Sequence, residues 1–161
     1  MSYRSNIWKL NLFMFFRALH FFVGILVPFY LQWGGISFTQ VMILEAVFVV
    51  AVFFFEIPTG AIADKFGRKT SLILSALSNA IAIILYSVYP NFLLFIVAEL
   101  FWGLAISLMS GANEALLYDS LKKLKRENES KKYFGRLRIY DLVAIAIAAP
   151  IGSFLSPIIG L

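Results

Sequence analysis

Six ionisable side chains interrupt the long apolar stretches of this sequence and are its first candidates for chemistry. They are Arg17, His20, Glu45, Glu56, Glu99 and Glu114. A charge at the centre of a membrane helix costs about 2.5 to 3.5 kcal/mol on insertion scales, so such residues usually have a function. Neighbouring carboxylates in apolar surroundings can share and release a proton, and the imidazole of His20 can join such a relay. The set therefore predicts a membrane pathway for a solute or for protons.

Helical spacing places these residues on a few common faces. Glu45 and Glu56 are eleven residues apart, which is about three helical turns. One stripe of polar or small residues comprises Arg17, His20, Gly24 and Pro28, and another comprises Glu99, Gly103, Ser107, Ser110 and Glu114. We expect both stripes to face inward, toward the pathway.

The depth of each charge suggests its partners. Arg17, Glu56 and Glu114 share the predicted cytoplasmic third of their helices, where one cation and two carboxylates can cluster. Glu45 and Glu99 share the outer third.

Structural interpretations of these charges stay open. Arg17 can snorkel to the headgroups, and Glu56 and Glu114 can be interfacial anchors. His20 can be a packing residue with a satisfied hydrogen bond. Asp141 stands at a predicted helix start, where a carboxylate favours the helix dipole, and we interpret it as structural.

Two further patterns have structural interpretations. A third stripe comprises Ser71, Ser75, Ser78, Ala82 and Tyr86, and such small residues also let membrane helices pack closely. We expect Phe53, Phe54 and Phe55 to face lipid. We interpret Trp8, Tyr30, Trp33 and Tyr89 as interfacial belt residues.

Composition places the elements that carry these residues in a membrane. The chain is 61% hydrophobic and 17% aromatic, with a mean hydropathy of +0.85, well beyond a soluble domain. It has no cysteine and one histidine, which excludes thiolate and multi-histidine metal sites, so we expect no metal and no cofactor. No segment is long enough for a separate catalytic domain, and we expect no enzyme activity.

Five apolar stretches are each long enough to span a bilayer as a helix, which needs roughly 20 residues. They are residues 11–31, 39–62, 70–88, 91–117 and 140–161. The sequence therefore predicts an all-α integral membrane protein with five transmembrane helices. A signal peptide is a poor interpretation of the first stretch, because it is long, carries Arg17 and lacks a cleavage site.

The cations indicate the orientation. Most Lys and Arg residues fall in the amino-terminal segment and in the predicted loops 63–69 and 121–139, whereas residues 32–38 and 89–91 carry no charge. By the positive-inside rule we expect the amino terminus and both charged loops in the cytoplasm of a multi-pass cell-membrane protein, and the carboxyl terminus outside. Topology explains the net charge of +5, so we expect no nucleic-acid partner.

A charged turn between the second and third stretches carries the most specific signal. It is Gly60-Ala-Ile-Ala-Asp-Lys-Phe-Gly-Arg-Lys69. This turn resembles the cytoplasmic loop signature of major facilitator superfamily (MFS) transporters, and residues 110–120 are similar to a fourth-helix ending found in the superfamily. The resemblance implies the first five helices of a six-helix amino-terminal bundle.

The resemblance also implies a conformational latch at this turn. The residues concerned are Gly60, Asp64, Lys65, Gly67, Arg68 and Lys69, and we hypothesise that Arg68 pairs with Asp119. In the superfamily this loop helps to hold the two halves of the carrier together on the cytoplasmic side.

The number of helices limits the functional prediction. Superfamily carriers normally have about twelve helices in two halves that rock about a central site. Five helices therefore predict a partial secondary active transporter, either a truncated product, a subunit completed by a second polypeptide, or a self-associating carrier. Its partners would be the bilayer, a small solute and protons. A non-transporting scaffold or remnant of a transporter gene is the alternative.

Overall fold

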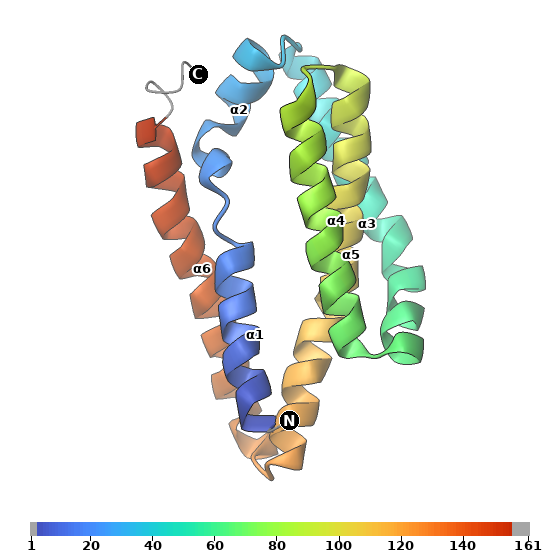
Figure 1. The fold of residues 1–161 in the computed structure, drawn as a ribbon, viewed down its shortest axis with the longest axis vertical. Helices are drawn as coiled ribbons and strands as arrows, with labels where there is room; N and C mark the ends of the chain where they lie inside the picture. Colours follow the sequence, from blue (N-terminus) through green and yellow to red (C-terminus); the bar gives the residue numbers. More distant parts are fainter. Residues whose placement is uncertain (1–2, 156–161) are drawn as a thin grey trace. The chain divides into compact units, whose positions relative to one another are not determined.

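Residues 3–155 of the protein, which the computed structural model describes, form helices joined by short connections (Figure 1). Its α-helices are α1 (Tyr3–Arg17), α2 (Leu26–Pro28), α3 (Phe38–Phe66), α4 (Arg68–Val88), α5 (Phe92–Lys123) and α6 (Ser130–Leu155). Two 3-10 segments, Phe21–Ile25 and Glu127–Glu129, and one π-helical segment, Phe29–Trp33, complete the described elements. No strand occurs within this part of the chain.

Five of the resulting segments are long and apolar enough to cross a membrane. They are Tyr3–Trp33, Phe38–Phe66, Arg68–Val88, Phe92–Lys123 and Glu127–Leu155. Even the shortest, with 21 residues, is about 31 Å long at 1.5 Å per residue and matches a hydrocarbon core of about 30 Å. The predicted all-α protein with five candidate spans is confirmed.

Side-chain caps fix where two of the long helices begin. The Ser37 hydroxyl accepts a hydrogen bond from the Gln40 amide at 3.2 Å, and the Gln40 side chain accepts one from the Ser37 amide at 2.8 Å. This capping box satisfies donors that the first turn of α3 leaves free. The Asn91 side chain accepts from the amides of Leu93 and Leu94 in the same way and starts α5.

The chain forms two compact units, which are described separately. Unit 1 comprises residues 1–26 and 113–161, and unit 2 comprises residues 27–112, so α5 contributes to both. In unit 1, α1 lies along α6 (Figure 1). The buried residues of these two helices are Ile7, Leu10 and Met14 on α1 and Tyr133, Leu137, Asp141, Ala144, Ala148 and Gly152 on α6.

The first membrane segment is broken, so the predicted stripe of Arg17, His20, Gly24 and Pro28 does not lie on one continuous helix, and that prediction is wrong. The α-helix ends at Arg17, and a 3-10 turn follows at Phe21–Ile25. Here the backbone packs closely on α6, with Gly24 against Ala149 and Ser153, and Gly152 against Phe21. The Ser153 hydroxyl donates to the Gly24 carbonyl at 3.2 Å and so satisfies one acceptor that the break leaves unpaired.

In unit 2, the serine stripe of α4 packs against α5. Ser71 donates to the Leu108 carbonyl at 2.6 Å, and Ser75 donates to the Ala105 carbonyl at 2.7 Å. All five residues of the stripe are buried. The helix-packing interpretation of this pattern is therefore confirmed, because small hydroxyl side chains allow close approach and cross-helix hydrogen bonds.

Another face of α5 packs against α3 at the small residue Gly103. A Cβ atom added to Gly103 would lie 2.7 Å from the Ala51 Cβ atom, so the two helices touch at this glycine. Ser107, one turn later, donates to the Val52 carbonyl at 3.0 Å. By contrast, Phe53 and Phe54 on α3 are 71% and 68% exposed, as expected for side chains that face lipid.

The helices extend further than the apolar stretches predicted. The expected loop 63–69 is almost entirely helical, because α3 ends at Phe66 and α4 begins at Arg68. Only Gly67 joins them, with a φ of 92° that favours glycine. Apolar composition marks where lipid ends, whereas a helix can continue into water when polar side chains pair along it.

The predicted loop 121–139 also differs from the structure. Helix α5 runs to Lys123 and α6 starts at Ser130, well before the predicted start at residue 140. Arg126 donates to both carboxylate oxygens of Glu129, at 2.6 and 2.8 Å, within the short connection between α5 and α6. The end of the predicted fifth helix, residues 156–161, lies outside the described residues.

Candidate functional site

Glu99 is a buried carboxylate inside the apolar span formed by α5. The residue is 6% exposed, and the Tyr30 hydroxyl donates a 3.0 Å hydrogen bond to its Oε1. The Tyr30 oxygen lies 3.2 Å from the hydroxyl of Tyr86, which can donate to it in turn. A hydrogen bond to a charged group is worth about 1.5 to 3 kcal/mol, so this contact offsets a large part of the cost of burying the carboxylate.

Three different elements bring these side chains together. Tyr30 lies in the π-helical segment that directly follows Pro28, and it is 1% exposed. Tyr86 ends the buried serine face of α4. Glu99 lies one turn after the buried Phe95 on α5. The ring of Tyr30 packs edge-on against the ring of Phe95, with the two ring centres 5.5 Å apart. A π-turn is uncommon and often marks a functional site.

Aromatic rings surround this polar contact. The Tyr86 ring lies 5.8 Å from Phe95 and 5.9 Å from Trp102, and Phe29 stacks on Trp33 at 4.8 Å. We call the set the aromatic cluster of unit 2; it comprises Phe29, Tyr30, Trp33, Tyr86, Phe95 and Trp102. The arrangement presents one carboxylate and two hydroxyls within an apolar, ring-lined environment.

The interpretation of Tyr30 as a belt residue is wrong. Belt residues keep their polar end at the membrane surface, whereas the Tyr30 hydroxyl is buried against Glu99. Trp8 and Tyr89 are 62% and 61% exposed and remain consistent with a belt position. Sequence spacing missed Tyr30 because the inward orientation depends on the π-turn. The sequence did contain a signal for Tyr86, the hydroxyl partner of Tyr30, because Tyr86 continues the buried serine stripe of α4.

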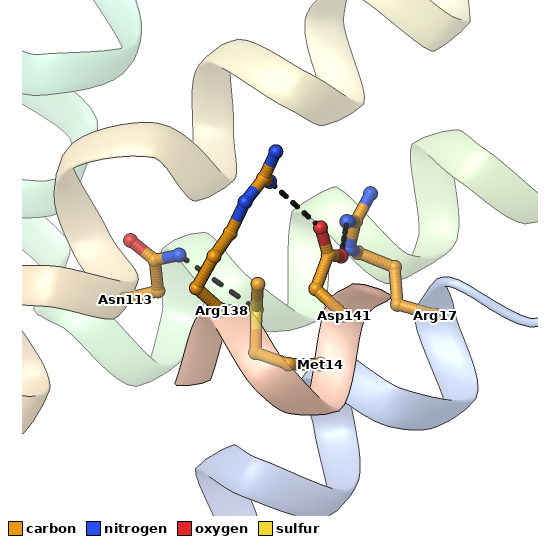
Figure 2. A network of polar contacts seen from close by, with 5 residues as sticks. All are labelled: Met14, Arg17, Asn113, Arg138 and Asp141. Atoms are coloured by element: carbon orange, nitrogen blue, oxygen red, sulfur yellow. Dashed lines mark hydrogen bonds and ion pairs between the residues drawn. The ribbon is translucent and has the colours of Figure 1, made fainter. Parts of the chain in front are cut away.

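A second charged group lies in unit 1, where Arg17 meets Asp141 (Figure 2). Arg17 donates from one terminal nitrogen to Oδ1 of Asp141 at 2.6 Å, and Arg138 donates to Oδ2 at 2.9 Å. The Asp141 side chain is 5% exposed, that of Arg17 is 17% exposed, and that of Arg138 is 70% exposed. The buried ion pair therefore joins α1 to α6, and Arg138 contributes from the surface.

This contact corrects the interpretation of Asp141. The sequence pattern placed Asp141 at a helix start, but α6 begins at Ser130, so the carboxylate lies well inside the helix. It compensates the charge of Arg17, the residue for which snorkelling was the alternative. Removing either partner of such a buried pair leaves an unpaired charge, which typically costs about 3 to 5 kcal/mol.

Two of the other predicted pathway residues interact electrostatically with these groups: Glu45 acts on Glu99, and His20 interacts with Arg17 and Asp141. Glu45 and Glu56 are exposed on α3, and Glu114 is exposed on α5. His20 is half-buried at the start of the 3-10 turn. Arg17 and Glu114 belong to unit 1 and Glu56 to unit 2, so the expected cluster of these three stays a prediction.

The charged turn at residues 60–69 forms its own ion pair. Arg68 donates to Asp64 at 2.8 Å across the Gly67 link, and the Lys65 ammonium lies 5.3 Å from the centre of the Phe66 ring. Gly60 has open space around it, and Lys69 is exposed. Asp119 belongs to the other unit, so its pairing with Arg68 stays a prediction.

Comparison with known proteins identifies the family. The model of the Major Facilitator Superfamily matches residues 10–161. An "Uncharacterized MFS-type transporter YxaM" from Bacillus subtilis (strain 168) is 30% identical over 109 residues, which cover 65% of this chain and 27% of that protein. No solved structure matches the chain significantly. Because the family model covers nearly the whole sequence, the chain belongs to the Major Facilitator Superfamily.

Proposed function

We propose that this chain takes part in the movement of a small solute across the cell membrane as part of a secondary active transporter. The observation that carries the proposal is the buried Glu99 carboxylate, held by Tyr30 inside a membrane-spanning segment of a superfamily chain. A carboxylate in such surroundings is costly to bury, so a residue of this kind inside a membrane span usually has a function in transport or proton exchange. A carrier rather than an enzyme is also what the family supports.

We further propose that the five helices are the amino-terminal portion of a larger carrier. The matched segment covers 27% of the curated relative's length, which supports a carrier with more helices than these five. A second polypeptide or further copies of this chain would supply the remaining helices. Alternating access then proceeds by rocking of the two halves about the solute site.

The proposed orientation has the amino terminus in the cytoplasm. The connection around Gly67 and the connection between α5 and α6 carry the cations, and the turn between α4 and α5 carries none. The positive-inside rule then assigns the two charged connections to the cytoplasm. There the ion pair of Asp64 and Arg68 lies at the membrane rim, where it can bias the ends of α3 and α4.

In the proposed mechanism, Glu99 exchanges its hydrogen-bond partner during transport. When a proton or a cationic solute binds to the Glu99 carboxylate, the hydrogen bond from the Tyr30 hydroxyl to the carboxylate weakens. Tyr30 then keeps only its hydrogen bond with Tyr86. Loss of the bound cation restores the contact. A switch of this kind couples occupancy of the site to the position of the segment that carries Tyr30.

The proposal is tested by profiling solute accumulation in cells that make the chain and in cells that carry an empty vector. We expect at least one solute to accumulate differently, and Glu99→Gln and Arg17→Gln to remove that difference. Glu127→Gln, which changes a carboxylate in the connection between α5 and α6, is the matched control and should behave like the wild type. Wild-type accumulation in both pathway variants would refute the proposal.

A further inference from the structure

We propose that the aromatic cluster of unit 2, with Glu99 at its polar end, is a binding site for an organic ammonium cation. The inference rests on the proposed function and specifies the class of solute. The site joins Glu99 and Tyr30 to the rings of Tyr86, Phe95 and Trp102.

The charge of Glu99 provides the first argument. Ion pairs among the described residues occur at Asp64, Glu129 and Asp141, and none involves Glu99. Asp141 in the same chain is buried to a similar extent and has two arginine partners, whereas Glu99 has only hydroxyl groups. A buried carboxylate without a cation attracts one, because its field is weakly screened in apolar surroundings.

The rings provide the second argument and restrict the kind of cation. A cation within about 6 Å of an aromatic ring centre is attracted by the negative face of the ring, most strongly with tryptophan. Tyr86 brings this kind of surface next to Glu99, since it shares a hydrogen bond with Tyr30 and contacts Trp102 and Phe95. An ammonium group with apolar substituents satisfies the carboxylate and the rings together.

Other solute classes fit this chemistry less well. A sugar needs several directed hydrogen bonds, but the cluster offers two hydroxyls and one carboxylate among six rings. An anion would be repelled by Glu99. A divalent metal ion prefers six or more oxygen ligands and would gain little from the rings.

In this proposal the cation gains access to the carboxylate by displacing the Tyr30 hydroxyl. Tyr30 and Glu99 are 1% and 6% exposed, so the site is closed in this conformation. The ammonium N–H or N–CH3 groups take the place of the Tyr30 hydroxyl at Oε1, and Tyr30 keeps a partner because the Tyr86 hydroxyl is 3.2 Å away. The Tyr30 hydroxyl thus occupies the position at Oε1 that the cation takes when it binds.

A matched pair of probes tests the inference. Benzyltrimethylammonium and neopentylbenzene have nearly the same shape and differ in charge. Binding of radiolabelled benzyltrimethylammonium is measured on the purified chain in nanodiscs of phosphatidylcholine, a lipid without net charge, with neopentylbenzene as competitor. We expect saturable binding that neopentylbenzene does not displace. Displacement by the neutral probe at equal concentration, or no saturable binding, would overturn the inference.

Variants assign the binding to this site. We expect Glu99→Gln to weaken binding about tenfold or more, and Trp102→Leu to weaken it by about 3- to 30-fold, the range of a cation–π contact. Glu127→Gln is the control and should bind as the wild type does. If Glu99→Gln fails to fold, as judged by circular dichroism, Trp102→Leu and the probe pair decide the outcome. Unchanged binding in the folded variants would contradict the assignment.

This inference and the proposed function fail in different ways. If benzyltrimethylammonium does not bind but Glu99→Gln abolishes the accumulation of another solute, the chain transports without using a cation site. If the probe binds through Glu99 but no solute accumulates, the site exists and the transport proposal fails.

Discussion

Replacing Asp141 by asparagine should weaken the packing of α1 on α6 more than any other single charge removal in unit 1. The Asp141 side chain is 5% exposed and lies 2.6 Å from Arg17, whose own side chain is 17% exposed. Breaking a buried pair costs about 3 to 5 kcal/mol, and the partial exposure of Arg17 favours the lower end. We therefore expect Asp141→Asn to lower the free energy of unfolding by about 3 kcal/mol.

The second arginine provides a matched comparison. Arg138 also contacts Asp141, at 2.9 Å, but its side chain is 70% exposed and returns readily to water. Exposed ion pairs contribute about 0 to 1 kcal/mol, so Arg138→Gln should cost less than 1 kcal/mol. We therefore expect Arg138→Gln to cost less than Arg17→Gln, mainly because the Arg138 side chain is much more exposed.

The assay is unfolding by sodium dodecyl sulfate in mixed micelles, monitored by circular dichroism. It is applied to Asp141→Asn, Arg17→Gln, the double variant of these two residues, and Arg138→Gln. Because Arg17 and Asp141 are in contact, their effects should not add. The loss of unfolding free energy in the double variant should be smaller than the sum of the two single losses, by at least about 1 kcal/mol. Additive effects, or a cost for Arg138→Gln equal to that for Asp141→Asn, would refute the assignment of the buried pair.

Two further predictions test the packing and the orientation. Gly103→Ala should lower the free energy of unfolding by about 1 to 3 kcal/mol, because the new Cβ atom would lie 2.7 Å from that of Ala51. Gly111→Ala in the same helix meets open space and should stabilise by up to about 1 kcal/mol; the opposite order would contradict the α3–α5 packing. The chain has no cysteine, so single cysteines can be labelled selectively. An impermeant reagent applied to whole cells should label Tyr89→Cys and not Asn128→Cys, and the reverse would invert the proposed orientation.

Long apolar runs and residue periodicity made the five candidate spans and the serine stripe predictable. Both depend on local properties, namely the hydropathy of about 20 residues and the recurrence of Ser71 and Ser75 on one helix face. The exposure of Phe53 and Phe54 on α3 was also predictable, because aromatic residues at the surface of such a span suit lipid, whereas Phe55, expected to face lipid with them, is half-buried.

The two polar groups were only half predictable, because each depends on an irregular or extended backbone. Glu99 and Arg17 were identified as costly buried charges, but their partners were not. Tyr30 faces inward because a π-turn follows Pro28, and no periodic pattern indicates such a turn. The apolar stretch that begins near Asp141 predicts a helix start there, whereas α6 starts in the charged segment at Ser130.

The position of Glu99 on a solute pathway can be measured without knowing the solute. Because the natural chain has no cysteine, Glu99→Cys gives one reactive thiol inside the membrane. A hydrophilic, impermeant thiol reagent should modify Glu99→Cys in native membranes at a rate between those of Tyr89→Cys, at the α4–α5 turn, and the lipid-facing Phe53→Cys. Protection of Glu99→Cys to the same extent as Phe53→Cys would mean that water never reaches this residue, and the proposed pathway would be contradicted.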